Sequence, residues 1–168
     1  MKKTISLLLA ILLLTLAGCG GEAEPSDIVP AETAPAASAV LDLQAIYDSM
    51  IAVENVPEML PLEADMQMNF CGIDPNDCVT SLVSICANSL RADEIWLIEA
   101  KDADALARIQ SAAQTRLTAK DEESATYSPE QNAIVKKAVT FSTGNYFMMV
   151  VSPDVDTLAS LFRTAAGL

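Results

Sequence analysis

Histidine is absent from this chain of 168 residues, and basic and aromatic residues are scarce. Without histidine the chain lacks the most common general base and metal ligand, and Ser-His or Cys-His catalytic arrangements are excluded. Ten basic residues face 23 acidic ones, which gives a net charge of −13. Such a chain is repelled by nucleic acid and by anionic lipid headgroups, and no basic stripe or RNA-binding aromatic pattern opposes that repulsion.

Sequence motifs of several enzyme classes are also missing. The chain has no glycine-rich phosphate loop, no serine nucleophile elbow and no calcium-loop spacing. Acidic pairs such as Asp74 with Asp77 occur, but Asp102 and Asp154 stand at predicted helix starts, where carboxylates complement the helix dipole. The methionines, including Met148-Met149, favour core packing over a soft-metal site. We therefore expect no catalytic residues, no cofactor and no metal.

The N-terminus has the layout of an export signal. Lys2 and Lys3 precede the apolar run Ile5–Ala17, which would span roughly 20 Å as a helix against about 30 Å of bilayer hydrocarbon. The run ends in Leu16-Ala17-Gly18-Cys19, which resembles the lipobox of bacterial lipoproteins. Residues 1–18 are therefore interpreted as a lipoprotein signal peptide.

The lipobox resemblance implies cleavage between Gly18 and Cys19 and lipidation of the Cys19 thiol with a diacylglyceryl group. Acyl chains such as palmitate anchor a protein because each buried CH₂ contributes about 0.8 kcal/mol, and two chains hold it stably. The membrane is then a partner through this lipid, and the protein lies on the outer face of the cytoplasmic membrane. An ordinary secretory signal with a chance cysteine is the alternative.

Residues 19–38 are predicted to be the anchor and a tether, and residues 39–168 a single domain. From Gly20 to Ser38 the chain contains prolines, alanines and glutamates but no aromatic residue, so it buries too little to fold alone. Such a flexible segment reaches on the order of 25 Å. Removal of residues 1–18 would delete two lysines and change the net charge from −13 to −15.

Hydrophobic periodicity predicts an amphipathic helix over 40–53 and a short helix over 64–70, with Pro57 and Pro61 between them. Two units of a hairpin followed by a helix come next. Their predicted elements are strands 79–87 and 94–99, a helix from Ala103 to Leu117 capped by Asp102, strands 137–142 and 146–151, and a helix whose N-cap is Ser152, followed by Pro153. The strand over 94–99 is apolar enough to be buried on both faces.

This order predicts an α+β fold with an antiparallel sheet of about four strands, built from two ββα units, and helices packed on one face. The N-terminal amphipathic helix or solvent would cover the other face. A shift of 52 residues sets Trp96-Leu97-Ile98 on Met148-Met149-Val150. The likeness indicates either a true duplication or the general similarity of hairpin-plus-helix pairs.

Three cysteines remain if Cys19 carries lipid, and an odd number leaves at least one of them unpaired. Cys78 and Cys86 would lie about 26 Å apart on an extended strand, so they cannot bond. Cys71 and Cys78 form the possible disulfide, because only a short turn separates them. We expect the three cysteines to be reduced packing residues, with this disulfide as the alternative, and a zinc site lacks a fourth ligand.

Four short motifs carry a family resemblance: Gly72-Ile73-Asp74-Pro75, Ala92-Asp93-Glu94-Ile95, Lys101-Asp102-Ala103-Asp104 and Gly144-Asn145-Tyr146. With the lipobox and tether, the chain resembles small Gram-positive lipoproteins of domain-of-unknown-function family 4358, from about residue 40 to the end. The resemblance implies a fold and a location in a Gram-positive envelope. It assigns no role to the three cysteines of the domain.

These features together predict a lipid-anchored extracytoplasmic protein whose domain is a non-enzymatic binding or interaction module of the cell envelope. Its partner would be another envelope protein and not nucleic acid. A small cell-envelope enzyme that uses carboxylate or thiol chemistry is the alternative.

Overall fold

The computed structural model describes residues 32–34 and 40–168, so the predicted signal peptide, Gly18, Cys19 and most of the predicted tether lie outside the described residues. In chain order the elements are β1 Glu32–Ala34, α1 Leu43–Ile51, β2 Met59–Pro61, α2 Ala64–Met66, the π-helix η1 Gln67–Cys71, the 3₁₀-helix η2 Pro75–Asp77, β3 Cys78–Cys86, β4 Glu94–Ala100, α3 Ala103–Tyr127, α4 Pro129–Val135, β5 Val139–Thr143, β6 Tyr146–Val151 and α5 Val155–Ala165. Within the described ranges, no helix is long and apolar enough to cross a membrane.

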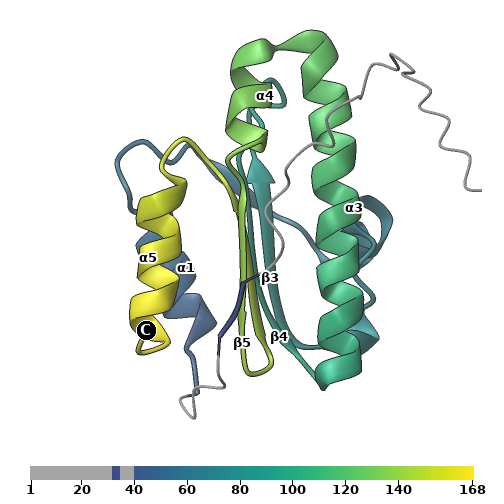
Figure 1. Ribbon diagram of the computed structural model, residues 1–168, viewed down its shortest axis with the longest axis vertical. Helices are drawn as coiled ribbons and strands as arrows, with labels where there is room; N and C mark the ends of the chain where they lie inside the picture. Colours follow the sequence, from purple (N-terminus) through teal and green to yellow (C-terminus); the bar gives the residue numbers. More distant parts are fainter. Residues whose placement is uncertain (1–31, 35–39) are drawn as a thin grey trace, which may run out of the picture.

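Six strands form one sheet in the order β1-β5-β6-β4-β3-β2. Figure 1 shows this sheet nearly edge-on. Strands β2 to β6 pair antiparallel, and β1, which belongs to the predicted tether, pairs parallel with β5. The α+β class, the antiparallel sheet, its four predicted strands and the N-terminal helix are confirmed. The additional strands β1 and β2 form the two edges. A strand ending at Pro61 is tolerated at an edge because proline donates no ladder hydrogen bond.

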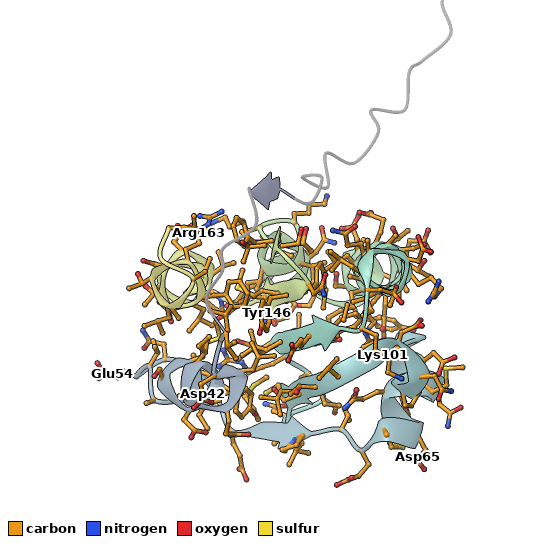
Figure 2. All side chains as sticks on the ribbon, turned by 90° about the horizontal axis from the view of Figure 1, so that it is seen from below. Asp42, Glu54, Asp65, Lys101, Tyr146 and Arg163 are labelled. Carbon is orange, nitrogen blue, oxygen red and sulfur yellow. The ribbon has the colours of Figure 1, made fainter. Side chains whose placement is uncertain are left out.

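Helices cover both faces of the sheet, so the prediction that they pack on one face is wrong. Helices α1 and α5 lie on one face, and α3 and α4 lie on the other (Figures 1 and 2). Ile95 and Leu97 of β4 pack toward α1 and α5, whereas Trp96 and Ile98 pack toward α3. Because successive side chains of a strand point to opposite faces, the continuous apolar run of β4 needs cover on both sides.

The two hairpin-plus-helix units have opposite hands. Strands β4 and β6 are antiparallel neighbours, and their hairpin partners β3 and β5 lie on their outer sides. A two-fold rotation about the sheet normal would superpose these hairpins, but it would leave both following helices on the same face. Because α3 and α5 lie on opposite faces, no rotation superposes the complete units. The internal likeness of the sequence therefore does not correspond to a repeated rigid unit.

Helix α3 starts where predicted, after the N-cap Asp102, and it is the long helix that the apolar positions indicate. Asp102 Oδ1 accepts a hydrogen bond from the Ala105 backbone N–H at 2.8 Å, as an N-cap does. The helix continues past the last predicted core position, Leu117, to Tyr127. Its final turns have few buried residues, so hydrophobic periodicity does not mark them.

The two later helices, α4 and α5, begin differently from the prediction. Ser128 Oγ accepts from the Gln131 N–H at 3.3 Å and begins α4, a helix that the sequence analysis missed. At α5 the N-cap is Asp154 rather than the predicted Ser152. Ser152 Oγ instead accepts from the Asp154 N–H at 3.2 Å, so Ser152 shapes the turn before the helix.

Candidate functional site

The three cysteines of the domain, Cys71, Cys78 and Cys86, are free thiols. Cys71 and Cys86 are buried, and Cys78 is half-buried at the opposite end of β3 from Cys86. Cys71 and Cys78 both contact the core beneath α3, but the possible disulfide between them is not formed. Burial, reinforced by the charge of Glu94, raises the pKa of Cys71 to about 12, so its thiol is protonated at neutral pH.

A fully buried carboxylate, Glu94 on β4, is the centre of an ion cluster under α3. Its Oε2 lies 2.9 Å from Arg116 Nη2 and 2.8 Å from Lys120 Nζ. The indole N–H of Trp96 donates to Glu94 Oε1 at 2.7 Å. Because every partner approaches from α3 or from β4 itself, the cluster ties the middle of α3 to the central strand.

The cations decide the ionisation of this carboxylate. Burial alone would raise the pKa of Glu94, but the charge of Lys120 and the charge and hydrogen bonds of Arg116 outweigh it, so that the pKa lies below its ordinary value. Glu94 is therefore a permanent anion at neutral pH. A carboxylate that is ionised and enclosed cannot act as a general acid, so this cluster is a structural device.

The sequence analysis missed this cluster, although a signal was present. Glu94 stands at the start of a strand that is otherwise buried, which requires a cationic partner. Arg116 and Lys120 are four residues apart and therefore on one helix face, next to the buried position Leu117. This pattern could have suggested that a buried carboxylate pairs with two cations of a helix, but it does not show which strand that helix covers.

The predicted acidic pairs have structural roles. Asp74 Oδ1 accepts from the Asn76 N–H at 2.8 Å, and Asp77 accepts two hydrogen bonds from Arg108. In the part of the chain that the structure describes, no three His, Cys, Asp or Glu side chains are grouped to hold a metal ion. Met148 and Met149 face opposite sides of the sheet and cannot share a ligand.

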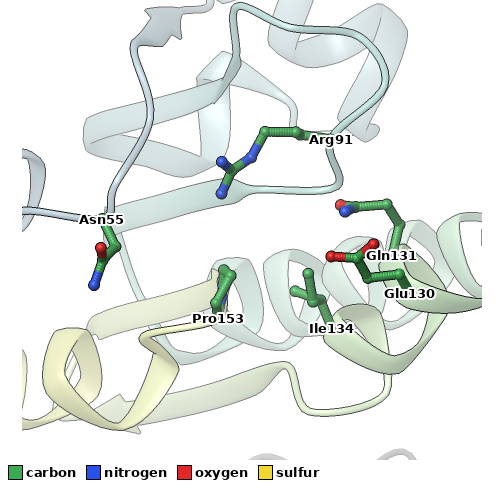
Figure 3. Close-up of a pocket in the computed structure, with 6 residues that line it drawn as sticks. All are labelled: Asn55, Arg91, Glu130, Gln131, Ile134 and Pro153. Carbon is green, nitrogen blue, oxygen red and sulfur yellow. The ribbon is translucent and has the colours of Figure 1, made fainter.

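One hollow of about 490 Å³ opens at the end of the sheet where β3 and β6 end (Figure 3). Arg91 is held at its wall by the buried carboxylate of Asp93, with an Nε–Oδ2 distance of 2.9 Å. Gln131 of α4 also lines it, and its Oε1 accepts from the Ala92 N–H at 2.9 Å. The remaining lining residues are Asn55, Glu130, Ile134 and Pro153. The hollow presents cationic, anionic, amide and apolar groups on four separate chain segments.

A second groove of about 390 Å³ runs between η1 and α3. Its η1 side is formed by Phe70, Cys71 and Gly72, and its α3 side by Arg108, Ser111, Ala112, Thr115, Arg116 and Ala119. Arg116 thus contacts both the groove and the buried Glu94. Among the described residues that line the two hollows, no nucleophile is hydrogen-bonded to a base, and both hollows are lined by groups suited to binding.

The comparisons with known proteins give a family without an assigned activity. The family described as "Domain of unknown function (DUF4358)" matches residues 52–152, which run from the end of α1 to the end of β6 and include Glu94, Arg91 and the η1–α3 groove. No curated protein and no solved structure matches the chain. The function must therefore be argued from the residues of the chain itself.

Proposed function

Because the chain belongs to the DUF4358 domain family, for which no activity is described, we propose its function from its own residues. It is a lipid-anchored protein on the outer face of the cytoplasmic membrane of a Gram-positive bacterium. Cys19 carries the lipid, a tether follows, and the folded domain is a non-enzymatic module that binds another component of the cell envelope.

The observation that carries this proposal is the lipobox-like Leu16-Ala17-Gly18-Cys19 directly after an apolar run and before a tether and a compact domain. The chemistry of the domain supports binding over catalysis. Its fully buried carboxylate, Glu94, is enclosed by two cations, and its buried thiol, Cys71, is protonated at neutral pH. The surface hollows offer hydrogen-bonding and apolar groups instead.

The test of the anchor is the replacement Cys19→Ala, followed by separation of membrane and soluble fractions. We expect the wild-type protein to be found in the membrane fraction and to incorporate a labelled fatty acid. The variant Cys19→Ala should not incorporate the label. Cys78→Ala is the matched control, because it also removes a thiol but lies in the domain. Labelling of Cys19→Ala at the wild-type level would refute the lipid anchor.

A further inference from the structure

Three large apolar side chains are exposed on the short stretch formed by α2 and η1. Met66 is 39% exposed, Met68 48% and Phe70 56%. Single exposed apolar residues are common on protein surfaces. Of these three, Phe70 also lines the groove between η1 and α3. Methionine and aromatic residues are enriched in protein interfaces, and methionine adapts its shape to different partners. Figure 2 shows the start of this stretch, at Asp65, on the same side of the sheet as α3.

The α3 wall of the adjacent groove is made of small side chains. Ser111, Ala112, Thr115 and Ala119 recur at helical spacing, so they share one face of the helix. The Thr115 hydroxyl donates to the Ser111 carbonyl at 3.0 Å, so this side chain already has a partner. A chain segment laid along the groove could therefore approach α3 closely and contact Phe70 on the other wall.

The charges on the groove are all positive. Arg108 and Arg116 line it, and no acidic side chain is among the lining residues that the structure describes. Eight residues of helix place these two arginines about 12 Å apart along its axis. Arg108 donates two N–H groups to Asp77, at 2.8 and 2.6 Å, of the five that a guanidinium carries. Each guanidinium is paired with one carboxylate, Arg108 with Asp77 and Arg116 with Glu94, so a partner would be bound by their remaining N–H groups.

We infer that the η1–α3 groove is the docking surface for a protein segment that combines apolar and acidic side chains. Apolar residues of that segment cover Phe70 and the small side chains of α3, and its carboxylates face Arg108 and Arg116. The inference deepens the proposed function by giving the chemistry of the partner. It rests on that function only for the expectation that the partner is an envelope protein.

The experiment uses a displayed library of random twelve-residue peptides, selected on the purified full chain. The test variant is Phe70→Asp with Arg108→Glu; both side chains are exposed, and Arg108→Glu also replaces the ion pair with Asp77 by two like charges. Leu90→Asp is the control for the Phe70→Asp change, because Leu90 is 82% exposed on the turn between β3 and β4, outside the groove. Fluorescence of the buried Trp96 checks that each variant is folded.

We expect the enriched peptides to contain Asp or Glu together with Leu, Phe or Met. They should bind the double variant at least tenfold more weakly and Leu90→Asp as tightly as the unchanged chain. Enrichment of basic peptides, equal binding to the double variant, or no enrichment at all would overturn the inference. Self-association of the chain that Phe70→Asp abolishes would also overturn it, because a second copy would then be the occupant. None of these outcomes depends on whether Cys19→Ala leaves the membrane.

Discussion

The two faces of the sheet are held to their helices in different ways. Beneath α1 and α5 the buried residues form an apolar cluster, with aromatic contact between Phe141 and Phe162 at a centroid distance of 6.0 Å. Beneath α3 the apolar cluster is joined by a fully buried anion, Glu94, and its two cations. The same strands therefore contact a largely apolar layer on one side, in which the Tyr146 hydroxyl has polar partners, and a partly ionic layer on the other.

The two faces differ in how directional their interactions are, and therefore in how closely the position of the covering helix is specified. Apolar burial is non-directional, so it stabilises α5 against the sheet without specifying a single position along it. The Glu94 cluster is directional, because the carboxylate accepts from Trp96, Arg116 and Lys120 at defined atoms. We expect the α3 face to respond to pH and the α5 face not to respond.

The largest effect is expected from Phe162→Ala on the α5 face. Phe162 is fully buried, and its truncation removes apolar contacts and leaves a cavity, which should lower the free energy of unfolding by about 4 kcal/mol. Urea unfolding followed by circular dichroism measures the loss. Phe162 contacts the ring of Phe141, and neither ring titrates, so the loss of stability should be the same at pH 4 and pH 7. A strong pH dependence would break the comparison.

The next effect is expected from Glu94→Gln on the α3 face. The substitution keeps the shape but leaves Arg116 and Lys120 without their buried counter-charge, which should cost about 3 kcal/mol at pH 7. Glu122→Gln is the control, because Glu122 is exposed on α3, the helix that carries Arg116 and Lys120. Urea unfolding followed by the fluorescence of Trp96 reports this face directly, since Trp96 donates to Glu94.

The pH dependence of that cost has a definite sign. The pKa of Glu94 in the folded protein lies below its ordinary value of 4.5, so the stabilisation is fully present above pH 4.5. It is lost as the pH falls through the lower, folded-state pKa. The wild-type protein and Glu94→Gln should therefore converge in stability at acid pH. A difference that stays constant down to pH 2 would contradict the loss of this stabilisation by protonation of Glu94 in the acid range.

The smallest effect is expected from Cys71→Ala, which should cost about 1 kcal/mol at pH 7. The pKa of the Cys71 thiol is raised from 9.0 to about 12, so between these values the unfolded thiol ionises while the folded one stays protonated. The wild-type protein loses stability over that range, and the cost of the substitution should shrink there. Ile109→Val on the same face is the control of similar size, and its cost should not change between pH 7 and pH 11.

The positions of most elements could be predicted from the sequence because they depend on local patterns. The Asp102 cap, the apolar run from Ile95 to Ile98 and the turn at Gly144 each act over a few residues. Strand β2 and helix α4 were missed because each is short and carries little periodicity. The Glu94 cluster was missed because its three charges come from a strand and a helix, and no local sequence pattern indicates that these two elements are in contact.

By itself, the sequence determined the acidic charge, the export-like N-terminus, the α+β class and the order of the hairpins and helices. Only the tertiary structure decided that α3 and α5 lie on opposite faces, and hence that the two units have opposite hands. Alternation along β4 and β6 requires that both faces be covered, but it does not say which helix crosses to which side. That choice places Glu94 under Arg116 and brings Phe70 beside α3, so both the ion cluster and the groove follow from it.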